Sequence, residues 1–279
     1  MSTFSKAFSD ISEEAYLAQY DIRNYPCCAV TADVALFSLL TRKSDNYRKE
    51  RSKALSVLLI HRRAHPERGK LALPGGFVRP GETVERCAMR ELTEETGLTP
   101  GALTLLGVFS DAARDPRGRV ISTAFLSAVP ERPFELCAAG DAADVGWYEI
   151  ALRPAQDGLL RLTLTGAQDT VSALLRPQCG PGGTRRMEVV ENEGLAFDHA
   201  AILAEAVEQL RRSAQSYDLV FRFLPERFTL GDFQQAYEKI TDTPVLAANF
   251  RRKITELVRE TEDFTSGTGH RPARLYTKR

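Results

Sequence analysis

The hydrophobic and polar positions of the chain first predict a set of β-strands. Apolar runs predict strands at 29–40, 56–61, 103–109, 120–129 and 146–148. The run at 56–61 is apolar except at its ends, so we expect that strand to lie in the centre of a sheet with both faces covered. The charged residues 42–53 predict an exposed loop between the first two strands.

Two stretches carry apolar residues at helical spacing. Residues 83–96 contain no Pro or Gly, Thr83 is a suitable N-cap, and Gly97 stands where helices often end. Every fourth residue from Val84 is apolar, which predicts one buried stripe along this helix. Residues 197–213 form a second amphipathic pattern, and we expect a helix there as well.

The stretch between the last predicted strand and the second helix is the hardest part to interpret. It is rich in Gly and Pro, and only 160–164 has a strand-like pattern. We therefore predict three parts. Residues 1–154 form a first domain with an N-terminal extension, 155–216 an irregular segment and a linker helix, and 217–279 a C-terminal domain.

Composition places the chain among proteins of a reducing cytoplasm. Its 279 residues suffice for one large or two ordinary domains, and its formal net charge of zero means that DNA binding would need a local basic patch. The five cysteines are odd in number and form no CxxC pair, which argues against a disulfide framework or a zinc site. The N-terminus has no apolar core of a signal peptide, and no apolar run approaches the roughly 20 residues of a membrane span.

Three carboxylates on the first helix are the strongest chemical signal. Glu91 and Glu95 are one helical turn apart, Glu94 is three residues from Glu91, and Arg90 can hold Glu94 from i to i+4. Clustered carboxylates repel one another unless a cation lies among them, and ligation by oxygen alone favours Mg²⁺ or Mn²⁺. Such an ion would activate water toward a diphosphate. The alternative is a helix face that is merely solvated.

Residues 76–98 also carry a complete family pattern. They match G-x5-E-x7-R-E-U-x-E-E-x-G-U, where U is apolar, and on this motif the chain resembles the Nudix family. The resemblance implies a mixed α/β (α+β) fold, an α/β/α sandwich around a mixed sheet. It also implies hydrolysis of a nucleoside diphosphate linked to a second group. By the same resemblance, metal ligands would be Glu91, Glu94, Glu95 and the Gly76 carbonyl, and the catalytic residues would be Glu94 and Glu91, supported by Glu82 and Arg90.

A basic loop at 111–119 narrows the resemblance. Residues 114–122 are similar to a segment of ADP-ribose pyrophosphatases and of the Nudix-related transcriptional regulators (NrtR). Guanidinium groups suit the diphosphate of such a ligand, and the residues predicted to bind it are Arg114, Arg117, Arg119 and Phe77. The alternative is a solvated hairpin loop. Asp141 or Asp144 could act as the general base.

The C-terminal part has the order of elements of a winged helix-turn-helix. Thr229 is a credible N-cap of one helix, a second helix is expected at about 246–258, and 264–276 reads as two short strands around a glycine turn. From 247 to 279 there are eight Lys or Arg against four acids. The residues predicted to contact DNA are Arg251, Arg252, Lys253, Arg271 and Arg274. The alternative is a basic appendage for dimerisation or for covering the first domain.

The C-terminal segments 228–230, 249–254 and 271–276 resemble the winged-helix domain of NrtR-type regulators. That resemblance implies a homodimer that binds operator DNA and a nucleoside-diphosphate sugar such as ADP-ribose. Many such regulators have a damaged Nudix motif, whereas the motif here is intact. Two functions therefore stay open: a regulator that also retains Mg-dependent hydrolysis, or a metabolic ADP-ribose pyrophosphatase whose C-terminal domain serves assembly. A hydrolase of nucleoside triphosphates fits the 114–122 segment less well.

Overall fold

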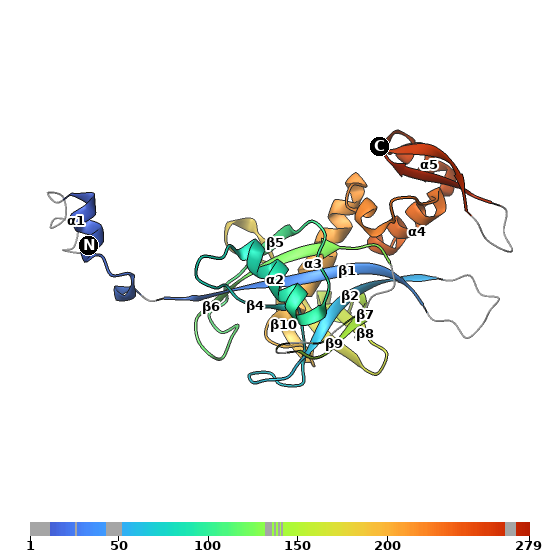
Figure 1. Cartoon of the computed structure of the whole chain (residues 1–279). Coiled ribbons are helices and arrows are strands. Elements are labelled where there is room, and N and C mark those ends of the chain that lie inside the picture. Colours follow the sequence, from blue (N-terminus) through green and yellow to red (C-terminus); the bar gives the residue numbers. More distant parts are fainter. Residues whose placement is uncertain are drawn as a thin grey trace.

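The protein consists of a curled mixed sheet with helices on both faces and a small helical domain beside it (Figure 1). The computed structural model describes residues 12–25, 27–42, 52–131, 136, 138, 140, 142–265 and 272–279. A short helix, α1 (Glu13–Gln19), lies apart from the main body at the N-terminal side (Figure 1). Within the described residues, no helix is both long enough and apolar enough to cross a membrane.

One sheet contains ten strands in the order β10-β9-β8-β7-β2-β1-β6-β5, with β3 and β4 paired to β2 and β1. The strands are β1 (Ala29–Thr41), β2 (Lys53–Arg62), β3 (Leu71–Ala72), β4 (Gly75–Phe77), β5 (Thr104–Phe109), β6 (Val120–Ala128), β7 (Ala142–Pro154), β8 (Leu160–Thr165), β9 (Thr170–Cys179) and β10 (Arg185–Glu193). The β1–β6 pair is parallel and the other pairs are antiparallel. The sheet is therefore mixed, as predicted.

The predicted strands are confirmed, and two are longer than expected. β2 begins at Lys53 rather than Ser56, and β7 spans 142–154 rather than 146–148. The exposed loop predicted at 42–53 lies mostly outside the described residues. β2 is buried along most of its length between β1 and β7, which agrees with the central position predicted for it.

The segment from 155 is not irregular, and this expectation was wrong. Strands β8, β9 and β10 continue the same sheet beyond β7. Leu162 and Leu164 alternate with polar residues and are fully buried, so β8 has one covered face. The Gly- and Pro-rich stretch is the turn between β9 and β10, where Gly182 and Gly183 adopt positive φ. Where one folding unit ends and the next begins remains a prediction.

Two helices cover opposite faces of the sheet. α2 (Val84–Thr96) has Thr83 as its N-cap, whose hydroxyl accepts the Arg86 N–H. Its C-cap is Gly97, in the left-handed region, and both caps are as predicted. Its buried residues pack with Val34 and Leu36 of β1. α3 (His199–Ser213) packs on the other face, with Ala35 and Phe37. Alternate residues of β1 are thus buried against different helices, which explains the continuous apolar run at 34–37.

The C-terminal domain is a winged helix. It contains α4 (Leu230–Thr241), α5 (Ala247–Ile254) and a hairpin of β11 (Val258–Phe264) and β12 (Arg274–Lys278). Thr229 and Asp232 form the capping box expected at the start of α4. The second helix ends at Ile254 rather than Val258, because Val258 pairs with Lys278 at the start of the wing. The first wing strand accordingly begins six residues earlier than predicted.

The buried core continues from the sheet into the winged helix. Phe233 and Phe250 of this domain belong to the same apolar cluster as the α3 face of the sheet. At the surface, Arg153 of β7 forms an ion pair with Asp242, the C-cap residue of α4. Arg211 of α3 lies 3.8 Å from the same carboxylate. α3 therefore connects the two domains directly.

Candidate functional site

A glycine pair brings the chain close to the first helix. Gly75 and Gly76 belong to β4 and pair with Asp33 and Ala32 of β1, so this segment is a short strand. A Cβ atom on Gly76 would lie 2.5 Å from the Glu91 carboxylate, and one on Gly75 would lie 2.4 Å from Asp33 Oδ1. Only glycine fits at position 75, where backbone atoms of β1 are close, whereas a side chain at position 76 would displace the Glu91 carboxylate.

The three predicted metal-binding carboxylates lie on the α2 face next to this strand. Glu95 is only 5% exposed and accepts a hydrogen bond of 3.0 Å from the Gly75 N–H. Glu91 is half-buried against Gly76, and Glu94 is exposed. The Gly76 carbonyl faces the same helix, because it accepts a 3.5 Å hydrogen bond from the Cys87 thiol.

Arg90 holds the acidic groups in position. Its Nε and Nη2 donate to the two carboxylate oxygens of Glu82 at 2.7 and 2.9 Å, and its Nη1 lies 2.5 Å from Glu91. The predicted contact to Glu94 is present at 3.2 Å. The hydrogen bonds from Arg90 lower the pKa of Glu82 to about 2. A bidentate guanidinium–carboxylate pair of this kind fixes the helix against the 76–82 segment.

These oxygen donors fit a hard divalent cation. The set consists of three carboxylates and a backbone carbonyl, and the missing side chain at Gly76 leaves the Glu91 carboxylate accessible from β4. Among the residues that the structure describes, no three His, Cys, Asp or Glu side chains converge as a preformed metal centre would. The donor chemistry favours Mg²⁺ or Mn²⁺ over zinc.

The three arginines of the 111–119 loop have different environments. Arg114 is buried, its side chain is only 4% exposed, and it donates to both carboxylate oxygens of Asp198 at 2.9 and 2.7 Å. Arg117 is bound to Asp115 and lies over the Phe77 ring, 5.0 Å from its centroid. Arg119 is exposed and donates to the Ser110 carbonyl. Arg117 and Phe77 are thus in contact, and their binding of a ligand stays a prediction.

A buried polar group lies beneath the glycine pair. Asp33 accepts a hydrogen bond from the Ser122 hydroxyl, and Arg114 lies 4.0 Å from it. The Leu73 N–H donates to Nδ1 of His199 at 2.9 Å, so a neutral His199 carries its proton on Nε2, which lies 3.9 Å from Asp33. Burial lowers the pKa of His199 and keeps it neutral.

Sequence reasoning missed two residues of this site, Arg62 and Phe197. The Arg62 guanidinium lies 4.9 Å from the centroid of the Phe197 ring, and that of Arg117 lies 5.7 Å from it. Phe197 has a φ of 51°, a left-handed conformation that is unusual for a bulky residue. Neither residue lies in a motif. Phe197, just before α3, contacts Arg62 at the end of β2 and Arg117 of the 111–119 loop, and these three residues are far apart in the sequence.

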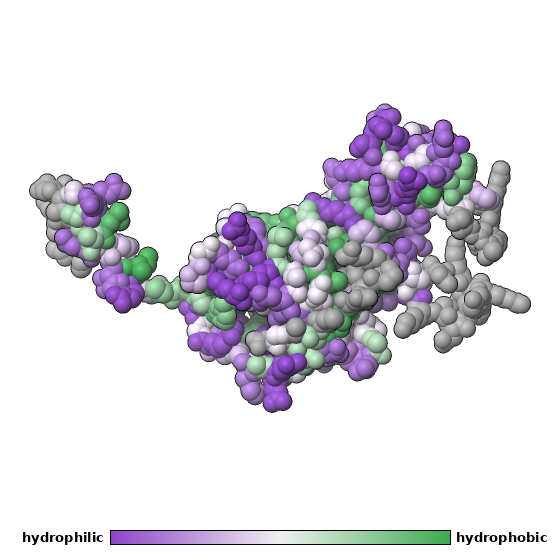
Figure 2. Space-filling view, viewed as in Figure 1, coloured by the Kyte–Doolittle hydropathy of each residue, from purple (hydrophilic) through white to green (hydrophobic). Residues whose placement is uncertain are grey.

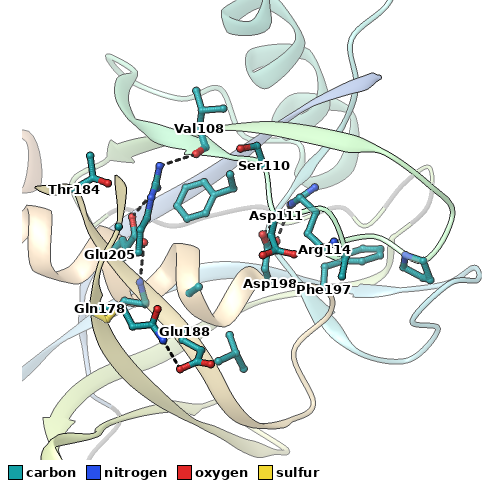
Figure 3. Close-up of a pocket in the computed structure, with 18 of the residues that line it drawn as sticks. Val108, Ser110, Asp111, Arg114, Gln178, Thr184, Glu188, Phe197, Asp198 and Glu205 are labelled. Carbon is teal, nitrogen blue, oxygen red and sulfur yellow. Dashed lines mark hydrogen bonds and ion pairs between the residues drawn. The ribbon is translucent and has the colours of Figure 1, made fainter. Parts of the chain in front are cut away.

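Two neighbouring cavities share Arg114 and Phe197 in their walls. The smaller one, of about 80 Å³, lies next to the glycine pair and Phe77. The larger one, of about 1190 Å³, lies between β5, β10 and the N-terminal half of α3 (Figure 3). Figure 3 shows Glu205 and Asp198 reaching this cavity from the α3 side and Ser110 and Asp111 from the loop. The two cavities adjoin at these two residues and are together called the cleft below; the larger cavity alone has the size of a small-molecule site.

The winged helix presents a separate basic surface. Arg251, Arg252 and Lys253 are all exposed on α5, and hydrophilic residues dominate the visible face of this domain (Figure 2). Arg274 of the wing is exposed, but it forms an ion pair with Glu260 at 2.6 Å. Arg271 lies outside the described residues. The structure thus brings the α5 cations together and gives Arg274 a local partner.

Comparison with known proteins identifies both domains. The model of the NUDIX domain matches residues 46–159, and that of the NrtR DNA-binding winged helix domain matches residues 220–277. The chain is 38% identical over 151 residues to an ADP-ribose pyrophosphatase of Methanocaldococcus jannaschii, covering 54% of this chain and 78% of that protein. The chain belongs to the Nudix family.

Two further proteins resemble this Nudix protein over nearly its whole length. It is 28% identical to the ADPR responsive transcriptional repressor NtrR of Acinetobacter baylyi, covering 95% of this chain and 88% of that one. A MutT/nudix family protein from Enterococcus faecalis has a similar structure, with a TM-score of 0.71, 25% identity and coverage of 97% and 95% of the two chains. The predicted pairing of a Nudix domain with an NrtR-type winged helix is confirmed.

The general base of this Nudix protein remains a prediction. Asp141 lies outside the described residues. Asp144 lies on β7 opposite His61, and its carboxylate accepts the N–H of Val145 at 2.8 Å. This hydrogen bond uses Oδ1 of Asp144, and Oδ2 is the oxygen that would accept a proton from water if Asp144 is the general base.

The Arg90–Glu82 pair predicts how stability depends on pH. The folded-state pKa of Glu82, about 2, is below its ordinary value of 4.5, so the pair stabilises the fold above pH 4.5 and loses that contribution as the pH falls toward 2. Replacing Glu82→Gln should therefore destabilise the protein at neutral pH, and by progressively less in acid. Urea unfolding of both proteins at several pH values measures this difference. A difference that stays constant down to the acid limit of folding would contradict the assignment.

Proposed function

We propose that this Nudix protein is a transcriptional regulator that binds operator DNA through its winged helix and binds ADP-ribose, or a similar nucleoside-diphosphate sugar, in its Nudix domain. The observation that carries this proposal is the exposed Arg251–Lys253 run on the second helix of an NrtR-type winged helix. In a helix-turn-helix that second helix enters the major groove. The Acinetobacter repressor, similar over both domains, supports the assignment.

The ligand would lie in the cleft between the glycine pair and α3. Arg117, Phe77 and Arg62 would contact its phosphates and aromatic or sugar groups, with Mg²⁺ or Mn²⁺ held by Glu91, Glu94, Glu95 and the Gly76 carbonyl. Arg119 remains a candidate at the rim of the loop. A homodimer acting in the cytoplasm completes the proposal, since two half-sites on DNA require two winged helices.

The proposal is tested with the full-length protein and DNA fragments from its own source. Fragments that bind the protein are recovered, sequenced and re-tested as single duplexes at fixed salt concentration, because nonspecific binding depends strongly on salt. ADP-ribose binding is measured in parallel by calorimetry. Enrichment of a defined sequence together with ADP-ribose binding supports a regulator. DNA binding without any preferred sequence contradicts it.

Hydrolysis of the ligand is a second candidate function. The complete motif and the pyrophosphatase relative favour it. A bound divalent cation would polarise a phosphoryl oxygen and lower the pKa of a bound water. The residues of this chain would orient the site: Glu95 accepts a hydrogen bond from the Gly75 N–H, and Arg90 forms ion pairs with Glu91 and Glu82.

Replacing Glu95→Gln should lower any Mg-dependent release of AMP from ADP-ribose by about 100-fold or more, because it removes a charge from the cation site. The matched control is Glu85→Gln, an exposed position on the first turn of the same helix. AMP release is followed by chromatography. Equal rates for the Glu95 variant and the unmodified protein would show that this carboxylate does not support catalysis.

A further inference from the structure

The cleft carries opposite charges at its two ends. Three basic residues and two acidic residues line the smaller cavity beside the glycine pair: Arg62, Arg114, Arg117, Asp33 and Asp115. This end is formally positive. Because guanidinium groups bind diphosphates well, the small cavity is the end suited to the phosphates of a ligand.

The larger cavity is formally negative. The acidic residues in its wall are Glu67, Asp111, Glu188, Asp198 and Glu205. The basic residues are Lys70, Arg114 and Arg186, and each of these already faces one of those acids: Lys70 pairs with Glu67, Arg114 with Asp198, and Arg186 with Glu205. Asp111 and Glu188 are the remaining acids of the wall; Glu188 has its basic partner, Arg176, outside the wall at 2.9 Å.

The position of Arg186 makes it a poor phosphate ligand. Its Nη2 donates to the Val108 carbonyl at 3.1 Å, its Nη1 lies 3.5 Å from Glu205, and its guanidinium stands over the Phe109 ring at 5.4 Å. Glu205 is itself fixed, because its side chain is 14% exposed and accepts the Met187 N–H at 3.2 Å. The Arg186 guanidinium is thus held in the cavity wall by Glu205 and Val108 and is not free to bind a phosphate.

The two remaining carboxylates face the cavity as hydrogen-bond acceptors. Asp111 is exposed, and one of its oxygens accepts the Ala113 N–H at 2.8 Å. Glu188 is exposed and is joined to Gln178 and Arg176 through a single oxygen, Oε2. Each group therefore retains an oxygen that can accept from a ribose hydroxyl or an amino group. A carboxylate that binds a ribose diol also disfavours a phosphate on the same sugar.

We propose that the larger cavity binds the nucleoside end of the ligand and selects against an additional phosphate on that ribose. This inference rests on the proposed function, since it assumes a nucleoside-diphosphate sugar in the cleft. The protein would then distinguish ADP-ribose from 2′-phospho-ADP-ribose, which differ by one phosphate monoester. Asp111 and Glu188 are the specificity-determining residues, acting by like-charge repulsion and by hydrogen bonding to the unmodified diol.

The test compares two ligands on two proteins. The dissociation constants of ADP-ribose and of 2′-phospho-ADP-ribose are measured by calorimetry with the full-length protein and with Asp111→Asn/Glu188→Gln. Both substitutions keep the size of the side chain and one hydrogen-bond acceptor. The unmodified protein should bind ADP-ribose at least about 10-fold more tightly, and the double variant should reduce that ratio toward one. Glu191→Gln, exposed on β10 outside the cavity, is the matched control and should keep the ratio.

The outcomes separate the two proposals. Equal affinity of the unmodified protein for both ligands would overturn the selectivity and leave ADP-ribose binding intact. An unchanged ratio in the double variant would overturn the assignment of that selectivity to Asp111 and Glu188. Failure of the unmodified protein to bind either ligand would overturn the proposed ligand itself, and the selectivity with it.

Discussion

Replacing Arg114→Met is expected to lower the free energy of unfolding by about 3–5 kcal/mol, the range observed when one partner of a buried ion pair is removed. The Arg114 side chain is buried between Asp198 and Asp33, at 2.7 and 4.0 Å. Methionine would leave two carboxylates facing each other with little access to water. Replacing Asp198→Asn should cost less, because Arg114 then still has Asp33 beside it.

Urea unfolding of the two single variants and of the double variant measures this coupling. The double variant should be more stable than the sum of the single effects suggests, since Asp33 is then the one carboxylate of the group that has lost Arg114, instead of Asp33 and Asp198 together. A loss below about 1 kcal/mol for Arg114→Met, together with much weaker ADP-ribose binding, would contradict the structural role. It would favour the ligand-binding role that the sequence suggested.

The double substitution Arg251→Glu/Arg252→Glu is expected to weaken DNA binding by about 100-fold or more at moderate salt. Both side chains are exposed on α5, where a phosphate backbone would lie, and each reversal replaces an attraction by a repulsion. Binding of ADP-ribose should stay unchanged, because α5 lines neither cavity. Fluorescence anisotropy with a labelled duplex measures the first effect, and calorimetry the second.

Arg161→Glu is the matched control for this prediction. It makes one such charge reversal, half the change of the double variant, at an exposed position of β8, in the sheet rather than in the winged helix. DNA affinity should fall far less for this variant. A double α5 variant that keeps normal DNA affinity would remove α5 from the DNA interface and favour the enzyme with an assembly domain.

The parts of the fold that were predictable have local causes. The helix at 84–96 could be located because its cap, its apolar stripe and its terminal glycine all lie within fifteen residues, and the acidic site follows from its spacing. The strands β9 and β10 could not, because their covered faces depend on pairing with β8 and on α3. A Gly- and Pro-rich turn between them made the segment resemble an irregular region.

The same distinction applies to the candidate site. The sequence indicates that 111–119 is basic, but it does not indicate that Arg114 meets Asp198, a residue far along the chain at the start of α3. Nor does it bring Phe197 to Arg62, since that contact depends on the left-handed backbone at Phe197. Charge type was therefore predictable from sequence, and the pairing of charges was not.

One helix, α3, contacts both the larger cavity and the winged helix. α3 lines the larger cavity with Ala201 and Glu205 at its N-terminal half. At its C-terminal end Arg211 donates to the Leu152 carbonyl and lies beside Asp242 of the winged helix. A ligand that changes the position of α3 would thus change the placement of α4 and α5. Linkage then requires that DNA and ligand alter each other's affinity by the same factor.

The most direct test of the account titrates ADP-ribose into the complex of the full-length protein with its selected duplex, followed by anisotropy. Saturating ADP-ribose should weaken DNA binding by roughly 5- to 150-fold, the usual range of coupling between two sites. The same factor should appear when ADP-ribose affinity is measured with and without DNA. DNA affinity that does not change at saturating ADP-ribose would contradict a ligand-responsive regulator.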